Sequence, residues 1–287
     1  MEATELLKKV RRIEIKTRGL SRHIFAGEYH SAFKGRGIAF SEVREYQYGD
    51  DIRSIDWNVT ARFNHPYVKV FEEERELTVM LLIDVSGSGN FGTKVSYKKD
   101  IMTEVAAVLS FSAIFNNDKI GVIFFSDKVE KFIPPLKGSK HILRIIRELL
   151  DFKSKSQKTN LDEPLRFLTN AIKKRCTAFI ISDFIVPEFE EALRIASNKH
   201  DIVALKVYDQ VEQTIPDIGL IKVSDSETGE EKWIDTSSGY TRKAYEKWWN
   251  SHMEIIKNIF KRCGVDSTEL RTDLDYVKPL IKLFEKR

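Results

Sequence analysis

Apolar residues in the second half of the chain form short runs that alternate with segments of helical period. Residues 77–84 (LTVMLLID) are a continuous apolar run of strand-forming residues, and residues 95–116 after them are rich in Val, Ala, Leu and Phe. The runs KIGVIFFS, CTAFIISD and DIVALKVYD are similar, and SKHILRIIRELLDF, LDEPLRFLTNAIKK and PEFEEALRIAS have helical period. This alternation predicts a Rossmann-like α/β domain over residues 77–287, with a mostly parallel sheet and helices on both faces.

Three further segments add detail to this domain. KVEKFIPP alternates and ends in two prolines, which predicts an edge strand or hairpin arm. GLIKVSDSETGEEKWIDTS predicts two short strands around a turn, and residues 240–264 predict a long last helix closed by Gly264. The side chains of this helix that we expect to pack on the sheet are Tyr245, Trp248, Trp249, Ile255, Ile256, Ile259 and Phe260.

The first part of the chain lacks this alternation. Residues 3–18 have helical period, and the following residues are first Gly-rich and then dense in charged and aromatic side chains. They predict loops and short elements, with an extended segment from Tyr67 onward. We therefore expect residues 1–76 to be an extension wrapped on the sheet of residues 77–287, not a separate domain.

Composition narrows the class of protein. The chain has 287 residues, 31% charged and 42% hydrophobic, which is typical of a soluble globular protein. It has no apolar run near the ~20 residues of a membrane span and no signal-peptide core, so we expect a cytoplasmic protein. Cys176 and Cys263 are too few for a disulfide framework or a zinc cluster and are expected to be reduced thiols. Residues 1–36 carry nine Lys/Arg and four Asp/Glu, which favours the solvated face of an amphipathic helix over a nucleic-acid contact.

Two of the predicted strands end in an acidic residue, Asp84 and Asp183. Ser86 and Ser88 follow the first strand, and Thr159 lies in a polar loop before a helix. Ligands of open α/β sheets bind outside the carboxyl ends of the strands, where these five side chains could converge. Carboxylates and hydroxyls are hard oxygen ligands, which suit Mg²⁺ first, then Mn²⁺ or Ca²⁺, and do not suit Zn²⁺.

Other interpretations of these residues stay open. Ser86 and Ser88 could cap the following helix, and Thr159 and Asn160 precede Asp162 as in a capping box. The sequence contains no P-loop, no dinucleotide fingerprint and no nucleophile elbow, and none of its six histidines pairs by spacing with a nucleophile. We therefore do not expect an enzyme.

The sequence DVSGS at 84–88, together with Thr159 and Asp183, resembles the metal-ion-dependent adhesion site of von Willebrand factor A-type domains. The resemblance implies that the three hydroxyls ligate a divalent cation directly and that the two acids bind it directly or through water. It also implies that a carboxylate of a partner completes the coordination shell. Many such domains have Gly after the third-loop acid, whereas here Phe184 follows Asp183.

Residues 35–62 (GRGIAFSEVREYQYGDDIRSIDWNVTAR) closely resemble the signature of the domain of unknown function 58 (DUF58) family. VKVFEEERE just after them and TDLDYVKPLIKLFEKR at the end of the chain do so too, and the resemblance covers nearly the whole chain. Members of that family have an A-type-like domain and are commonly encoded beside MoxR-type AAA+ ATPases. The resemblance therefore implies a protein partner of that type.

The signature is dense in charge. Its candidate functional residues are Asp50, Asp51, Arg53, Asp56, Trp57 and Arg62. Because Arg–carboxylate pairs are planar and bidentate, we expect an ion-pair network that pins the extension to the sheet. A docking surface or an anion site is the alternative.

These observations favour a cytoplasmic, divalent-cation-dependent protein-binding adaptor that works with a MoxR-type AAA+ ATPase in assembling or maturing another complex. One alternative is a metal-dependent phosphohydrolase or nuclease with Arg53 or Arg62 as an anion clamp. Another is a structural scaffold with a vestigial ion site. We expect neither a nucleic-acid partner nor a membrane span.

Overall fold

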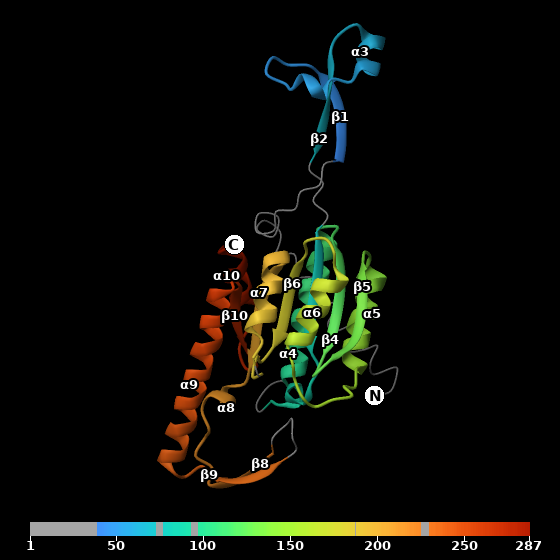
Figure 1. The fold of residues 1–287 in the computed structure, drawn as a ribbon. Coiled ribbons are helices and arrows are strands. Elements are labelled where there is room, and N and C mark those ends of the chain that lie inside the picture. The colour runs from blue at the N-terminus through green and yellow to red at the C-terminus, as the bar shows by residue number, and fades with distance from the viewer. Residues whose placement is uncertain (1–38, 73–76, 93–96, 187, 225–229) are drawn as a thin grey trace. The chain divides into compact units, whose positions relative to one another are not determined.

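The computed structural model describes residues 39–72, 77–92, 97–186, 188–224 and 230–287 (Figure 1). The chain divides into two compact units, one formed by residues 33–77 and one that contains residues 78–287. The packing of residues 1–76 on the sheet stays a prediction. The helix predicted at residues 3–18 lies outside the described residues.

The small unit is built on a pair of antiparallel strands. Its elements are β1 (Ala39–Glu45), η1 (Ile52–Ser54), α3 (Trp57–Phe63) and β2 (Tyr67–Glu72). The predicted extended segment from Tyr67 is confirmed as β2. The sequence prediction missed β1, because the segment AFSEVRE places charged residues among its apolar ones and lacks a continuous apolar run.

The larger unit contains a six-stranded sheet with the order β10-β7-β6-β3-β4-β5. Its strands are β3 (Thr78–Asp84), β4 (Lys119–Phe125), β5 (Val129–Leu136), β6 (Thr177–Ser182), β7 (Asp201–Tyr208) and β10 (Asp266–Arg271). All neighbours pair in parallel except β5, which is antiparallel to β4. The predicted mostly parallel sheet is confirmed, and so is the edge strand that contains Pro134 and Pro135.

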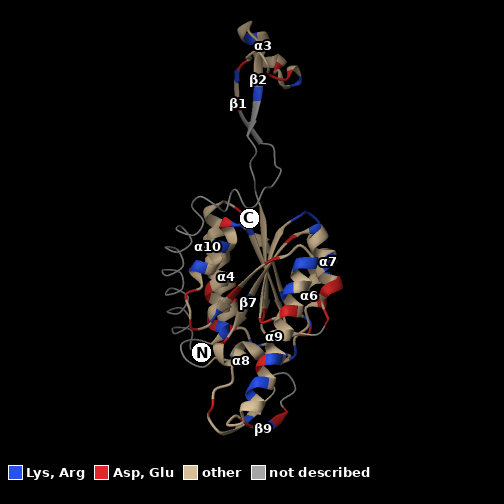
Figure 2. Cartoon of the chain, turned by 90° about the vertical axis from the view of Figure 1, so that its left-hand side faces the viewer, with Lys and Arg blue, Asp and Glu red and all other residues tan. Residues whose placement is uncertain are grey.

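Helices cover both faces of this sheet (Figure 2). They are α4 (Lys98–Phe115), α5 (Ser139–Asp151), α6 (Asp162–Ala171), α7 (Glu190–Lys199), α9 (Gly239–Arg262) and α10 (Val277–Glu285). α4 and α10 lie on one face, and α6, α7 and α9 lie on the other. Short elements complete the unit: η2 (Gly87–Asn90), α8 (Gln210–Gln213) and the antiparallel pair β8 (Leu220–Ser224) and β9 (Glu231–Asp235). None of the described helices is both long enough and apolar enough to cross a membrane.

The central strand β3 explains why its sequence is apolar without alternation. Successive side chains of a strand point to opposite faces of the sheet. Met80 and Leu82 belong to the hydrophobic cluster formed with α6, α7 and α9, whereas Leu81 and Ile83 point to the opposite face, and all four are fully buried. A strand covered on both faces has no position for a polar residue until it reaches its end at Asp84.

The prediction that the fold ends with one long helix is wrong. After α9 the chain makes a sixth strand, β10, and a further helix, α10. β10 has the sequence DSTELR, in which only Leu270 is fully buried. It lies at the edge of the sheet, so most of its side chains are polar and it lacks the apolar run that marks the inner strands.

The predicted inner face of α9 is also partly wrong. Trp249, Ile256, Ile259 and Phe260 are buried as expected. Trp248, however, is 49% exposed and stacks on the ring of His252 at a centroid distance of 5.6 Å, and Ile255 is 56% exposed. Two consecutive residues of a helix point about 100° apart, so Trp248 and Trp249 do not share a face.

Candidate cation site

The strand order reverses between β3 and β6, which are neighbours in the sheet but not in the sequence. Later strands extend the sheet from β3 on one side and from β6 on the other, and ligands bind at such a switch point in open α/β sheets. Ile83 pairs with Ile181 in the parallel register, so the two strands end side by side. Asp84 ends β3, and Asp183 directly follows Ser182, the last residue of β6.

The carboxylate of Asp84 is buried and held by two hydrogen bonds. The hydroxyl of Ser182 donates to Oδ2 at 2.7 Å, and the backbone N–H of Ser86 donates to Oδ1 at 2.9 Å. The second bond is the local turn that Asp commonly makes with a residue two positions later. The fold thus fixes Asp84 at the tip of the central strand.

The two serines of the loop after β3 lie next to each other. The Oγ atoms of Ser86 and Ser88 are 3.2 Å apart. Adjacent ligands of an octahedral Mg²⁺ with bonds of about 2.1 Å lie about 3.0 Å apart, and the longer bonds of Ca²⁺ widen this separation. The spacing of the hydroxyls therefore suits neighbouring positions around one hard cation.

The alternative that these polar residues cap a helix applies to the loop before α6 but not to the loop after β3. Ser86 precedes η2 without a side-chain cap bond, and α4 begins only at Lys98, after Tyr97. In the other loop, the side chain of Asn160 accepts the N–H of Asp162 at 2.8 Å, as a helix cap does. Capping thus explains Asn160 but not Ser86.

Thr159 is buried in the loop before α6. This loop is attached to the serine loop by a backbone hydrogen bond from the N–H of Gly87 to the carbonyl of Gln157, at 3.1 Å. The structure therefore joins the two loops that the sequence predicted to converge. The direct ligation of a cation by Thr159 stays a prediction.

Asp183 has a partner that the sequence did not reveal. The ammonium of Lys98 donates to Asp183 Oδ2 at 2.8 Å and to Glu212 Oε1 at 2.6 Å, and the side chain of Lys98 is only 1% exposed. Burial by itself lowers the pKa of Lys98, but the two carboxylates outweigh burial and raise it. Lys98 lies 85 residues from Asp183 and 114 from Glu212, so no local pattern could indicate this triad.

The donor set fits a divalent cation in part. Asp84, Ser86 and Ser88 offer hard oxygens at a suitable spacing. Asp183 is bound to Lys98 through Oδ2 and accepts the N–H of Ile185 through Oδ1 at 3.2 Å, so both of its oxygens already have partners inside the protein. Across the described residues, no group of three or more His, Cys, Asp or Glu side chains forms a metal site. A cation at this site would rely on hydroxyls and on Asp84.

A small cavity of about 250 Å³ opens beside Asp84 and Ser86. Its lining includes Lys99 and Lys153, and Asp183 is not part of it. The Nζ of Lys99 donates to the carbonyl of Phe152 at 3.0 Å, and burial lowers the pKa of this lysine. The cavity therefore presents positive charge next to the candidate cation ligands.

Burial, together with the nearby charge of Asp183, raises the pKa of Asp84 to about 6, and hydrogen bonds from Ser86 and Ser182 limit the rise. Between about pH 4 and pH 6 the carboxyl of Asp84 is therefore protonated in the folded protein but ionised in the unfolded chain. Because the folded state binds more protons, the free energy of unfolding falls as the pH rises through this range. In EDTA, we expect the free energy of unfolding of wild type to fall by about 2 kcal/mol more than that of Asp84→Asn between pH 4 and pH 7. Urea unfolding across this range measures the difference, and parallel curves for the two proteins would contradict it.

Several charged residues of the family signature form contacts inside the small unit. Arg44 forms a bidentate ion pair with Asp50, at 2.7 and 2.8 Å, and this contact lowers the pKa of Asp50. Asp51 accepts the N–H of Arg53 at the start of η1, and Asp56 accepts two N–H groups at the start of α3. The acids of the signature thus support its own turns and helices.

Three other signature residues remain at the surface of the small unit. Trp57 is 67% exposed, and Arg53 and Arg62 are exposed too. Within the described residues, neither arginine takes part in an ion pair. They are available to a partner, as the docking alternative requires, and the contact of the signature with the sheet stays a prediction.

Comparison with known proteins identifies the relatives of this chain. The family model described as "Protein of unknown function DUF58" matches residues 42–255. The uncharacterized protein Rv1480 of Mycobacterium tuberculosis is 27% identical over 99% of this chain and 90% of its own length. The uncharacterized protein YeaD of Bacillus subtilis is 29% identical, over 38% of this chain and 25% of its own length.

Solved structures resemble the fold. An aerotolerance-related membrane protein from Bacteroides fragilis matches with a TM-score of 0.51 and 16% identity, over 74% of this chain and all of that chain. The VWA domain of SpRpn10 matches with a TM-score of 0.40 and 10% identity, over 74% of this chain and 96% of that chain. The chain therefore belongs to the DUF58 family, and its sheet domain shares the fold of the aerotolerance-related protein.

Proposed function

We propose that this protein is a cytoplasmic, divalent-cation-dependent protein-binding adaptor. The observation that supports it is the convergence of Asp84, Ser86 and Ser88 beside an open cavity at the switch point of the sheet. A cation bound there would keep a coordination position for an oxygen of a partner. The protein's own residues would orient the cation, and the partner would complete its shell.

The cavity favours an acidic side chain of the partner. Its volume of about 250 Å³ admits a side chain but not a folded element, and Lys99 and Lys153 line it. Opposite charge at short range stabilises a carboxylate where water is partly excluded. An Asp or Glu of the partner can thus reach the Asp84 site without net repulsion.

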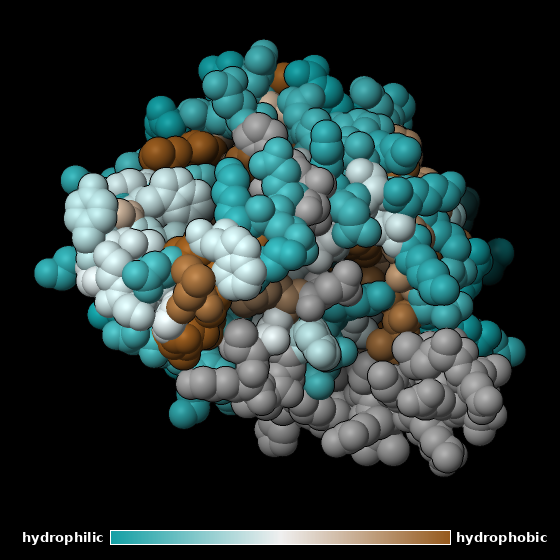
Figure 3. Space-filling model, turned by 90° about the horizontal axis from the view of Figure 1, so that it is seen from below, coloured by the Kyte–Doolittle hydropathy of each residue, from teal (hydrophilic) through white to brown (hydrophobic). Residues whose placement is uncertain are grey.

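Exposed aromatic and apolar side chains supply area for a protein partner. On the small unit they are Tyr48, Ile52, Trp57 and Phe63, and around β8, β9 and α9 they are Leu220, Trp233, Tyr240 and Trp248. Figure 3 views the molecule from below and shows apolar and near-neutral side chains gathered on one side of that face. Aromatic residues are enriched at protein interfaces, so these surfaces support protein binding.

We further propose that the partner is a MoxR-type AAA+ ATPase and that the pair assembles or matures another complex. The support is the family membership together with the site above. Purified ATPase from the same organism should bind this protein more tightly in Mg²⁺ than in EDTA. Because linkage is reciprocal, the ATPase should raise the affinity for Mg²⁺ by the same factor. Equal affinity in Mg²⁺ and EDTA would argue against cation dependence.

The cation premise has a direct test by calorimetry. Wild type should bind Mg²⁺ or Mn²⁺ at one site per chain, Asp84→Ala should not, and Ser86→Ala should bind at least about tenfold more weakly because a ligand is lost. Ser251→Ala, on the exposed surface of α9, is the matched control and should bind like wild type. Identical titrations of wild type and Asp84→Ala would remove the premise.

One observation favours a second candidate function. The ammonium of Lys98 already binds both Asp183 and Glu212 at this end of the sheet. In a structural scaffold with a vestigial ion site, this internal cation would replace the bound one. Such a protein would bind its partner equally well in EDTA, which distinguishes it from the cation-dependent adaptor.

A further inference from the structure

The six-stranded sheet has two outer strands, β5 and β10, whose free edges differ. β5 contains Pro134 and Pro135, which have no N–H to offer to another strand. β10 contains no proline and pairs with β7 along its whole length, and no other strand of the described residues pairs with it. One row of backbone N–H and C=O groups of β10 therefore faces outward, as on any edge strand.

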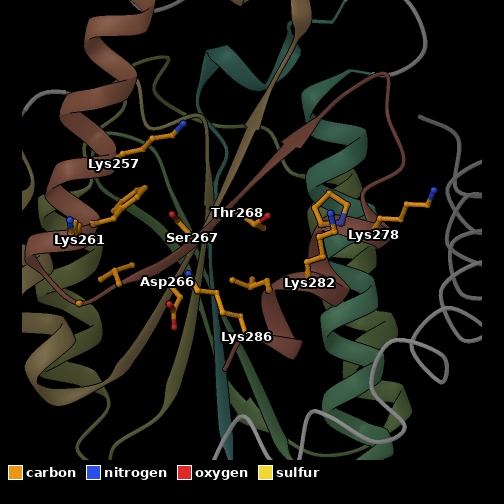
Figure 4. Close-up of a pocket in the computed structure, with 13 residues that line it drawn as sticks. Lys257, Lys261, Asp266, Ser267, Thr268, Lys278, Lys282 and Lys286 are labelled. Atoms are coloured by element: carbon orange, nitrogen blue, oxygen red, sulfur yellow. The ribbon is translucent and has the colours of Figure 1, made fainter.

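A hollow of about 680 Å³ lies between α9 and α10 and is lined by the first three residues of β10, Asp266, Ser267 and Thr268. Figure 4 shows β10 in the middle, with Ser267 and Thr268 labelled, and lysines of the two helices on either side. These lysines, which we call the lysine groove, are Lys257, Lys261, Lys278, Lys282 and Lys286. Within each helix they are four residues apart, so each set lies on one helix face.

The charge of the lysine groove is mostly unbalanced. All five lysines are exposed, and within the described residues only Lys257 forms an ion pair, with Glu269 at 3.2 Å. Asp266 is the one acid in the lining, and it pairs with Arg287 at 3.4 Å. Lysines on solvated helix faces are common, but here lysines of two helices line one hollow beside an unpaired strand edge.

We propose that the lysine groove binds an acidic, extended segment of a partner protein, which adds to the sheet as a strand beside β10. The six residues of β10 span about 20 Å, which matches a segment of six to eight residues. Side chains of an added strand alternate between the two faces of the sheet. Acidic side chains at successive positions would therefore meet the lysines of α9 and of α10 in turn.

The shape and chemistry of the groove favour a peptide over other occupants. The outward N–H and C=O groups of β10 repeat at the spacing of another strand, which is how strand addition recognises a peptide backbone. Among the described residues, Phe260 is the one aromatic residue in the lining and is buried, so none of them offers an exposed ring there to stack a nucleic-acid base. A second copy of this edge would bring its own lysines and be repelled.

The inference is independent of the proposed cation site, so the test is run in EDTA. The probe is a labelled eight-residue peptide in which pairs of adjacent Glu residues are separated by Val-Thr, so that each pair presents one Glu to each face of the sheet. Its binding to the full chain is followed by fluorescence anisotropy at low salt. The groove variant K278E/K282E/K286E should bind it at least about tenfold more weakly. The control K140E/K173E/K174E changes the net charge equally at exposed lysines elsewhere and should stay within about twofold of wild type.

Two further arms separate the explanations. The same peptide with N-methyl groups on every backbone nitrogen keeps its charge but has no N–H on either edge, so it cannot pair as a strand with β10 and should bind at least about tenfold more weakly. K257E/K261E changes the two groove lysines of α9 and should also weaken binding of the peptide. This variant replaces K278E/K282E/K286E in the test if that variant fails to fold. The proposal is overturned by no saturable binding at about 1 mM probe, by equal loss in the control, by full binding of the methylated peptide, or by an oligothymidine that displaces the peptide and binds more tightly.

Discussion

Replacing Lys98 with Met should lower the free energy of unfolding by about 3–5 kcal/mol in EDTA. Met has a similar length but no charge, so the substitution leaves the buried carboxylate of Asp183 and the partly buried carboxylate of Glu212 without their ammonium. Breaking a buried ion pair from one side is costly because the remaining charge has no compensation. Chemical denaturation at pH 7 measures the loss.

The neighbouring Lys99 provides the control. Its Nζ makes one hydrogen bond, to the carbonyl of Phe152, and no ion pair within the described residues, so Lys99→Met should cost only about 0.5–1.5 kcal/mol. Mg²⁺ should restore part of the stability of Lys98→Met if Asp183 is released toward the candidate cation site. Equal losses of stability for Lys98→Met and Lys99→Met would show that removing the ammonium of Lys98 does not leave a costly uncompensated charge.

Replacing Phe184 with Ala should destabilise the fold by about 3–5 kcal/mol, and replacing it with Gly should cost less. The ring of Phe184 is fully buried and meets Phe260 edge to face at 5.1 Å, so both substitutions leave a cavity. Phe184 also has a φ of 58°, in the left-handed region that disfavours side chains with a Cβ. Gly relieves this strain and Ala does not, so we expect the Gly variant to be more stable than the Ala variant by about 1 kcal/mol.

The test is which of the two variants, Phe184→Ala or Phe184→Gly, is the more stable. At Phe179, a fully buried position inside strand β6, Gly should be less stable than Ala by about 0.5–1 kcal/mol, because a regular strand gives glycine no advantage. Thermal or urea unfolding of the four variants gives both orders. If Gly were the less stable residue at both positions, the backbone of residue 184 would carry no strain.

The inner strands and the place of Asp84 could be predicted from the sequence because both follow from local pattern. A strand buried on two faces is mostly apolar, and the first acid after such a run marks its end. The serine loop was recognised for the same reason, since Ser86 and Ser88 follow Asp84 directly.

The features that could not be predicted depend on contacts between distant residues or on the edge of the sheet. Lys98 lies in an ordinary charged stretch, and only the fold brings it to Asp183 and Glu212. β10 was missed because a strand at an edge needs few apolar residues. The lysines of α9 and α10 have a regular spacing in the sequence, but their common groove needs β10 between them.

The strand order has a consequence for how the protein is made. β3 is the first strand of the sheet domain along the chain and lies inside the sheet; β4 and β5 extend it on one side, and β6, β7 and β10 extend it on the other. No strand has to insert between two that are already paired. A chain emerging from the ribosome presents each new strand after its neighbour has been synthesised, so the sheet can grow outward from its centre during translation, and β10 completes it last.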